Sequence, residues 1–469
     1  MAPTCNRAVS DLEPKLDGMA KAALLYACSE CGYSSPRWFG KCPGCGSFGT
    51  LAEERPATAT GSDAPRPVLR LVDVEAADAE RIATGVPELD RVLGGGLVLA
   101  SLVLVGGEPG VGKSTLLLSA LREMSEQHRV LLVTGEESAA QVRLRAERLG
   151  GGGNVEIVAE TELDAVCSTL EHERPAVSVI DSVQTLYSSE VGSTPGSVGQ
   201  VREAAARLLR VAKESGVAIF LVGHVTKDGA VAGPRALEHL VDCVLQFEGD
   251  RYREHRVLRA TKNRFGSTNE IGIFEMTASG LVGVPDPSEL FGRAEAGEVG
   301  SAVACTLEGT RPILLEIQAL ASQTDLAMPR RVATGLDPRR LAMIVAVLSR
   351  HAGLALGQAD VFVNVAGGVR IEEPGADLAV CLAIASAARG APVRDGLAAF
   401  GEVGLTGRIR PVTQAERRLE ECAKLGTSTT LVPRGTTASG RASLVQVETI
   451  REALSAGLEA GSAPATSPA

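Results

Sequence analysis

The clearest candidate for chemistry in this 469-residue chain is a glycine-rich segment that ends in lysine, serine and threonine. Its residues are Gly107, Glu108, Pro109, Gly110, Val111, Gly112, Lys113, Ser114 and Thr115. Glycines let backbone N–H groups turn inward around phosphates, and a following helix presents its positive N-terminus to the anion. Lys113 would reach the β- and γ-phosphates, and the Ser114 hydroxyl would bind Mg²⁺. The pattern therefore predicts a phosphate loop that binds ATP and Mg²⁺, rather than a chance glycine-rich turn.

Four polar residues follow apolar runs at the positions where strands of a nucleotide-binding sheet would end. Asp181 is the expected second acid, which orients Mg²⁺ and its waters, although a strand-ending Asp can be a simple cap. Either Glu136 or Glu137 can polarise the attacking water as general base, unless both are exposed loop acids. His224 ends another strand, where it would sense the γ-phosphate or serve as a structural histidine.

Four of the ten cysteines form two Cys-x-x-Cys pairs within 18 residues. They are Cys28, Cys31, Cys42 and Cys45. Two such pairs can wrap four thiolates around one tetrahedral Zn²⁺, and a site filled by four protein ligands is structural rather than catalytic. The other six cysteines lie singly in apolar stretches and are expected to be buried thiols.

The elements that would position these residues alternate between short apolar runs and longer amphipathic ones. Strands are expected at Ser101–Gly107, Val130–Gly135, Val177–Ser182 and Ala218–His224, and helices at Ser114–Met124 and Val201–Gly216. Nearly continuous Val, Ile and Leu in the strands predict a parallel sheet with helices on both faces, that is, an α/β fold.

A second folded unit follows the nucleotide-binding one. Asp337 as N-cap and Pro338 at the first helical position open a helix, residues 359–368 form a strand, and residues 377–390 form a helix that ends at glycine. We expect an N-terminal extension at 1–27, a zinc knuckle at 28–50, a linker at 51–79, an ATPase domain at 80–286, a second domain at 287–458 and a disordered tail at 459–469. The sequence leaves Met1 and Met19 as two possible starts.

Composition narrows the class of protein. The chain is 45% hydrophobic and 22% charged, which suits globular domains, and its net charge of −10 argues against a protein that coats nucleic acid with its whole surface. No run of 18 apolar residues and no secretion signal are apparent, so we expect no membrane partner and a cytoplasmic location. The basic run Arg251–Arg264 alone would suggest a solvated face.

The motifs together resemble a known family. The segments TGVPELDRVLGGGLV and GEPGVGKST, the EES of residues 136–138 and Asp181 are similar to the RecA/DnaB superfamily core. The KNRFG segment at 262–266, WFGKCPGCG and GLDPRRL…DVFVNVAGGVRIEEPGADLA resemble the RadA/Sms family in particular. This resemblance covers roughly residues 25 to 455.

The resemblance implies an ATP-dependent DNA motor of recombination and repair. It implies a homo-oligomeric ring, a hexamer, that threads single-stranded and branched DNA and acts as a helicase or branch-migration factor beside RecA recombinase. Lys262 and Arg264 would reach the γ-phosphate of a neighbouring subunit. Residues 188–199 and 225–234 would be channel loops, unless they are ordinary surface loops.

The C-terminal unit resembles the proteolytic domain of Lon proteases, an α+β domain with a Ser–Lys dyad. Gly375 stands at the serine position and Glu416 at the lysine position, so we expect no peptidase activity. Asp377 and Cys381 lie nearby, and Cys381 is expected to be a buried thiol. An ATP-dependent protease and a KaiC-like signalling ATPase remain the competing functions. The missing dyad argues against the first, and KNRFG with the zinc knuckle argues against the second.

Overall fold

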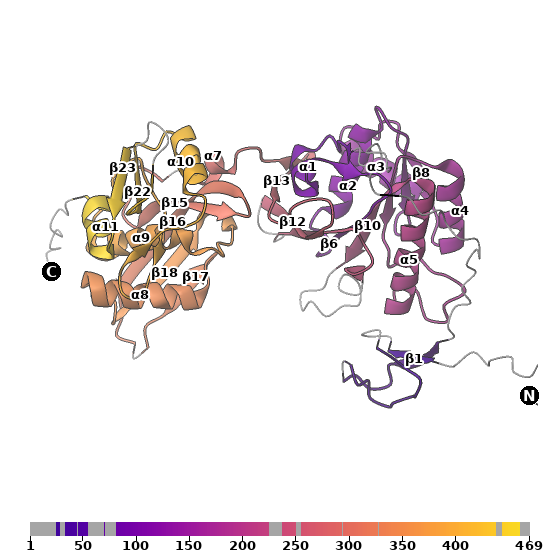
Figure 1. The fold of residues 1–469 in the computed structure, drawn as a ribbon, viewed down its shortest axis with the longest axis horizontal. Coiled ribbons are helices and arrows are strands. Elements are labelled where there is room, and N and C mark those ends of the chain that lie inside the picture. Colours follow the sequence, from indigo (N-terminus) through magenta and orange to yellow (C-terminus); the bar gives the residue numbers. More distant parts are fainter. Residues whose placement is uncertain are drawn as a thin grey trace, which may run out of the picture.

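The computed structural model describes residues 25–28, 33–44, 46–54, 70, 81–224, 237–249, 255–292, 294–326, 328–437 and 443–459. These residues form a small N-terminal ribbon, a large α/β domain and a C-terminal α+β domain (Figure 1). Residues 1–24 of the expected N-terminal extension, residues 460–469 of the expected tail, most of the linker and the loop at 225–234 lie outside them, whereas residues 25–27 belong to the first strand of the ribbon. Where each domain begins and ends stays a prediction.

The ribbon is a three-stranded antiparallel sheet in the order β2–β1–β3. Its strands are β1 (Leu25–Cys28), β2 (Ser34–Ser35) and β3 (Leu51–Glu54). Its buried cluster consists of Cys28, Cys42 and Leu51, with Tyr26 packed against it. So small an apolar cluster cannot hold a fold alone, and a bound metal is the usual supplement at this size.

The α/β domain is built on a nine-stranded sheet in the order β14-β13-β12-β11-β6-β10-β9-β7-β8. Its strands are β6 (Leu102–Gly107), β7 (Val130–Thr134), β8 (Glu156–Ala159), β9 (Val177–Asp181), β10 (Ala218–His224), β11 (Cys243–Glu248), β12 (His255–Asn263), β13 (Ile271–Thr277) and β14 (Gly280–Gly283). A separate hairpin pairs β4 (Arg81–Ile82) with β5 (Leu97–Val98). The predicted parallel sheet is confirmed from β11 to β8, and three antiparallel strands, which the sequence analysis did not foresee, extend it.

Helices cover both faces of this sheet. One face packs against α1 (Pro87–Leu93), α2 (Lys113–Met124) and α3 (Ala139–Arg148), and the other against α4 (Leu163–Glu173) and α5 (Val198–Ser215). Strand β6 shows why: Val103 and Val105 belong to the first core, while Leu102 and Leu104 belong to the second, because successive side chains of a strand point to opposite faces.

The C-terminal domain holds a seven-stranded sheet in the order β17-β18-β16-β15-β19-β22-β23. Its strands are β15 (Ser301–Glu308), β16 (Arg311–Gln323), β17 (Arg331–Thr334), β18 (Ala359–Val365), β19 (Leu397–Ala399), β22 (Thr429–Pro433) and β23 (Ser443–Val447), beside a hairpin of β20 (Glu402–Val403) and β21 (Ile409–Arg410). Its helices are α7 (Pro287–Phe291), α8 (Pro338–Ala352), α9 (Asp377–Arg389), α10 (Ala415–Lys424) and α11 (Ile450–Gly457).

The sequence signals for the two central helices of this domain are confirmed. The Asp337 carboxylate accepts the backbone N–H groups of Arg339 and Arg340 and so caps α8, and Gly390 ends α9 in the left-handed conformation. Helices α8, α9 and α11 share one core with the sheet, whereas α10 packs in a separate cluster that contains Leu419 and Cys422. No described helix is long and apolar enough to cross a membrane.

Candidate nucleotide site and zinc ribbon

The glycine-rich segment forms a tight loop between β6 and α2, as predicted. Gly110 (φ 81°) and Gly112 (φ 115°) have backbone conformations that favour glycine, and a Cβ at Gly112 would lie 2.8 Å from Cδ1 of Leu281. The Lys113 ammonium donates to the carbonyl oxygens of Gly107 (2.8 Å) and Glu108 (3.0 Å), and its side chain is buried. Lys113 therefore folds back over the loop, where a bound phosphate would meet it.

Two carboxylates lie close to this lysine. Burial lowers the pKa of Lys113, while the negative charges of Asp181 and Glu136 partly restore it. Asp181 is the last residue of β9 and is itself buried, and Glu136 accepts a hydrogen bond of 2.6 Å from the Ser182 hydroxyl. The structure thus brings Lys113, Asp181 and Glu136 together at the carboxyl edge of the parallel strands.

The structure also distinguishes the two neighbouring glutamates. Glu137 forms an ion pair of 3.2 Å with Arg145 of α3, whereas the charge of Glu136 raises the pKa of Lys113. This geometry favours Glu136 as the residue that would polarise an attacking water. No sign of Ser182 or Arg145 as partners of these glutamates is visible in the sequence. Ser182 is 46 positions from Glu136 and Arg145 is 8 positions from Glu137, and no local motif marks either pair.

The remaining predicted ligands lie at the same edge. Ser114 and Thr115 are in the first turn of α2, and His224 is the last residue of β10, paired in register with Gly107. Residues Asp181, Ser114, Lys113 and the loop backbone could hold Mg²⁺ and a nucleoside triphosphate. Oxygen ligands of carboxylate and hydroxyl type suit that cation, and the buried lysine suits the phosphates.

Lys262 and Arg264 lie at the opposite end of the sheet. The Lys262 ammonium donates to the carbonyls of Glu238 and Val241 (2.8 Å for Val241). The Arg264 guanidinium forms an ion pair of 3.2 Å with Asp242, and its side chain is 54% exposed. Asp242 also accepts the N–H of Leu102, the first residue of β6. Gly107 is the last residue of β6, and at ~3.3 Å per residue the two ends of this strand are about 16 Å apart. Arg264 cannot reach its own phosphate loop from there, and the Lys262 ammonium is held at the same end by the carbonyls just before Asp242.

Asp242 is a further residue that the sequence analysis missed. It is 2% exposed and is the shared partner of Arg264, of Lys213 (3.2 Å) and of the Leu102 amide (3.1 Å). A single Asp before an apolar strand carries no sequence signal of this role. It fixes the KNRFG segment to the strand that ends in the phosphate loop.

Part of the basic run Arg251–Arg264 differs from the solvated face that its composition suggests. Residues 251–254 lie outside the described part, but 255–263 form β12, in which Arg256, Leu258 and Ala260 are buried. The segment 188–199 is held against α5, because the Gln200 amide donates to the carbonyls of Ser188, Val191 and Ser193.

The ribbon presents two of the four predicted zinc ligands, Cys28 and Cys42, as buried side chains. Each begins a turn closed in the same way, by a bond from the cysteine N–H to the carbonyl five residues on, Tyr33 (2.9 Å) and Ser47 (2.8 Å). The Gly44 N–H also donates to Cys42 Sγ at 3.3 Å, which stabilises a thiolate. These paired turns fit a four-thiolate zinc site; Cys31 and Cys45 lie outside the described residues.

In the C-terminal domain, a buried ion pair occupies the neighbourhood of the expected dyad. Gly375 is buried, and Glu416 on α10 is exposed. The Glu373 carboxylate forms two hydrogen bonds of 2.7 Å with the fully buried Arg418, and it accepts the N–H of Leu307 at 2.8 Å. A Cβ at Gly375 would lie 2.6 Å from Oε1 of Glu373, so a side chain there needs rearrangement.

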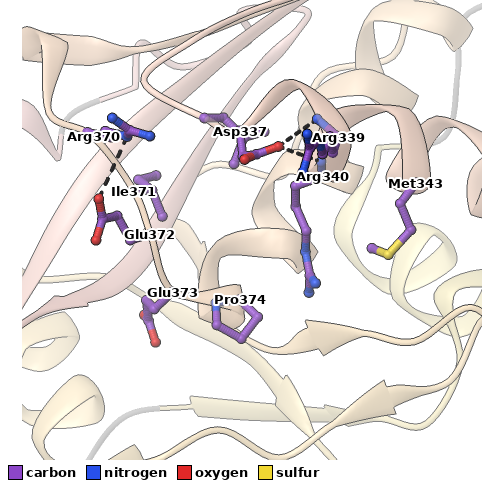
Figure 2. A pocket seen from close by; sticks show the side chains of 10 residues that line it. Asp337, Arg339, Arg340, Met343, Arg370, Ile371, Glu372, Glu373 and Pro374 are labelled. Carbon is purple, nitrogen blue, oxygen red and sulfur yellow. Dashed lines mark hydrogen bonds and ion pairs between the residues drawn. The ribbon is translucent and has the colours of Figure 1, made fainter. Parts of the chain in front are cut away.

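A pocket of about 560 Å³ opens beside this ion pair, between the start of α8 and residues 370–374 (Figure 2). Arg340, which lines it, forms a two-oxygen ion pair with Asp377. Cys381 is fully buried, as predicted, and burial raises the pKa of its thiol. No oxygen or sulfur nucleophile stands at position 375.

The fold and the loop geometry define a phosphate-loop enzyme of the RecA-like, ATP-hydrolysing class. The AAA domain family model matches residues 65–230, a rubredoxin metal-binding domain model matches 26–53, and a model of subunit ChlI of Mg-chelatase matches 338–436. The match to a solved KaiC-like protein of Pyrococcus horikoshii covers 44% of this chain and 100% of that protein, at 22% identity and a TM-score of 0.37.

Curated relatives identify the family more narrowly. DNA repair protein RadA of Bacillus subtilis is 48% identical over 88% of this chain and 93% of its own length, and that of Escherichia coli is 48% identical over 88% and 94%. DNA repair protein RadA of Pseudomonas aeruginosa is 49% identical over 89% and 94%. This chain belongs to the RadA family of DNA repair proteins, and the predicted resemblance is confirmed.

Proposed function

We propose that this protein is an ATP-dependent DNA motor of homologous recombination and DNA repair. It works as a ring, a hexamer, that hydrolyses ATP to drive helicase or branch-migration steps on single-stranded and branched DNA beside RecA recombinase. The names of its relatives support a role in DNA repair. The location of this work is the cytoplasm.

The observation that carries the ring is the distance between the two halves of the catalytic set. Lys113, Asp181 and Glu136 gather at one edge of the sheet. Arg264 is tied through Asp242 to Leu102, about 16 Å along the strand from Gly107, and Lys262 is level with Leu104, about 10 Å along it. The Arg264 side chain is 54% exposed and is distant from its own phosphate loop, so in this proposal it serves the nucleotide of a neighbouring subunit. Such an arrangement requires subunits that pack head to tail.

Within each site, residues have separate tasks. The loop from Gly107 to Thr115 binds ATP; Ser114 and Asp181 hold Mg²⁺, which polarises the phosphates; and His224 lies where it can sense the γ-phosphate. Glu136 positions and deprotonates water, and the partner's Lys262 and Arg264 stabilise the negative charge of the transition state. Four cysteines of the ribbon hold one structural Zn²⁺.

The C-terminal domain performs no peptide cleavage in this proposal. Gly375 supplies no nucleophile, and the exposed Glu416 has none to activate. The domain serves ring assembly or DNA handling instead.

The test is the rate of ATP hydrolysis with and without single-stranded DNA, in wild type and in Lys113→Ala. We expect strong stimulation in wild type and no turnover in the variant, which should still fold and keep its zinc. A rate that ignores DNA contradicts the motor, and wild-type turnover in Lys113→Ala contradicts the phosphate loop.

A further inference from the structure

The ribbon holds an unusual share of the chain's aromatic side chains. The whole protein has one Trp, four Tyr and nine Phe, and residues 26–48 contain the Trp, two of the Tyr and two of the Phe. Four of these rings are exposed: Tyr33 (39%), Trp38 (58%), Phe39 (39%) and Phe48 (77%). Among the described residues of the other two domains, Tyr187 is the one exposed aromatic side chain.

Two of the four rings are held in place while they face solvent. The Trp38 indole N–H donates to the Leu51 carbonyl at 3.2 Å, and a Cβ at Gly40 would lie 3.7 Å from Cη2 of the indole. Phe48 lies across the hairpin from Lys41, whose ammonium is 5.3 Å from the centre of the ring. Fixed rings lose little conformational entropy when a ligand stacks on them.

The chemistry of this surface favours the bases of a nucleic acid over an apolar protein surface. Between Tyr33 and Thr50 the chain has no Leu, Ile, Val or Met, so its large apolar groups are rings with π-faces. The same segment carries Arg37 and Lys41 and no Asp or Glu, although the whole chain has a net charge of −10. Rings that stack on bases beside cations that pair with phosphates are the usual means of binding single strands without sequence preference.

We propose that the zinc ribbon is a stacking platform for single-stranded nucleic acid, on which bases stack against Trp38, Phe39 and Phe48 while Arg37 and Lys41 pair with the phosphates. The inference rests on the proposed DNA function and adds a second DNA contact, separate from the ATPase ring. Duplex DNA does not bind in this way, because its bases are already stacked on one another.

The experiment uses the single tryptophan of the full-length chain as a reporter of the ribbon. The protein is titrated with an oligothymidine strand that carries a fluorescent label. The label absorbs at wavelengths too long to overlap tryptophan excitation or emission, so Trp38 emission and label anisotropy can be read from one sample. We expect saturable quenching of Trp38 by the strand and none by a duplex or by an abasic strand of equal length. Phe48→Ala should weaken the quenching affinity about five- to hundredfold per lost stack.

Leu144→Ala is the matched control, since Leu144 is 64% exposed on α3 of the ATPase domain and should leave the affinity unchanged. Every variant must retain one zinc per chain, which separates loss of stacking from loss of the fold. Phe48→Tyr keeps a ring and should bind as wild type does.

The outcomes separate this inference from the proposed function. Anisotropy that rises without any change in Trp38 emission overturns the stacking platform and leaves the DNA motor intact. No rise in anisotropy at any protein concentration overturns both. Quenching of Trp38 by RecA recombinase but not by the strand shows that the ribbon docks a protein, and it too overturns the platform.

Discussion

Glu136 and Glu137 are identical side chains at adjacent positions, and only their partners tell them apart. Glu137 is paired with Arg145, while Glu136 accepts from Ser182 and lowers the cost of the charge on Lys113. A general base must accept a proton from water near the phosphates, so a carboxylate that is paired with an arginine on α3 is the poorer candidate.

Glu136→Gln should therefore reduce ATP turnover about 10²- to 10⁴-fold, the usual contribution of a general base, while ATP still binds. Glu137→Gln is the matched control and should retain most of the activity, because it disturbs an ion pair that is partly exposed. Steady-state rates and binding of a fluorescent nucleotide measure both effects. Equal losses in the two variants would remove the distinction.

At the position where Lon proteases have the serine of a Ser–Lys dyad, this chain has Gly375 beside the Glu373–Arg418 ion pair. Arg418 is fully buried and saturates the Glu373 carboxylate, which in turn occupies the space next to Gly375. Removing one member of a buried pair leaves the other charged and unpaired, which costs about 3–5 kcal/mol.

Rebuilding the dyad as Gly375→Ser with Glu416→Lys should thus give no peptidase activity on unfolded substrate proteins. The new serine would meet the Glu373 carboxylate, and the new lysine would be exposed and therefore protonated at neutral pH, unable to act as a base. Cleavage by the double variant, and by neither single variant, would show that these two positions can still form a working Ser–Lys dyad.

At the scale of elements, β12 connects two functions. Lys262 lies near its end and Arg264 directly follows it. Asp242 ties Arg264 to the start of β6, and β6 ends in the subunit's own phosphate loop. A rigid sheet thereby links the nucleotide that a subunit binds to the cations that it offers its neighbour.

Arg264→Ala should abolish most turnover yet bind ATP normally, because the residue is distant from its own loop. Mixing it with Lys113→Ala should restore part of the activity, since some interfaces then combine an intact loop with an intact cation. Lys113→Ala mixed with Glu136→Gln is the control and should not recover, because both defects lie in the same half-site. Absence of rescue in subunits shown to exchange would count against action in trans.

The ribbon should depend on its metal in a way that the two larger domains do not. Chelation should release about one Zn²⁺ per chain and unfold the ribbon, whose cluster of Cys28, Cys42 and Leu51 is too small to persist alone. Trp38 emission should then shift toward that of a fully solvated indole. Cys28→Ser should lose the metal, whereas Cys167→Ser, a buried thiol of α4, should keep it; zinc retained by Cys28→Ser would refute the ligand set.

Prediction from sequence succeeded where the signal is local. The strand–glycine loop–helix unit at 102–124, the Asp337 cap and the Gly390 stop each depend on a few adjacent residues, and each is confirmed. Strands β12 to β14 were not predicted, because six of the nine residues of β12 are polar and its burial comes from antiparallel neighbours. Asp242 and Arg418 have partners over a hundred positions away, at Leu102 and Cys305, which no periodicity encodes.

At the scale of the whole molecule, the turn between β15 and β16 joins the ATPase domain to the C-terminal domain. Arg311 forms an ion pair of 3.0 Å with the buried Glu88 of α1, and Glu308 forms one of 2.9 Å with Arg259 of β12. Burial raises the pKa of Glu308 although Arg259 opposes the shift, which marks a desolvated contact. The C-terminal domain therefore contacts β12, the strand that contains Lys262, through the Glu308–Arg259 ion pair.

Gly309, in the middle of that turn, offers the sharpest test of this junction. Its φ of 67° favours glycine, and a Cβ there would lie 1.2 Å from the Asn269 carbonyl oxygen, so Gly309→Ala must push the turn away from the ATPase domain. Gly353→Ala is the matched control, because its φ is 70° and a Cβ there meets nothing within 4 Å.

Both variants carry the left-handed strain of about 1–2 kcal/mol. Only Gly309→Ala should separate thermal unfolding into two transitions and open residues 284–300 to limited proteolysis. DNA-stimulated ATP hydrolysis should fall with it, because displacement of Glu308 releases Arg259 three residues before Lys262. If the two variants unfold alike and are cut alike, the turn is a passive contact, and the coupling of the domains must be sought elsewhere.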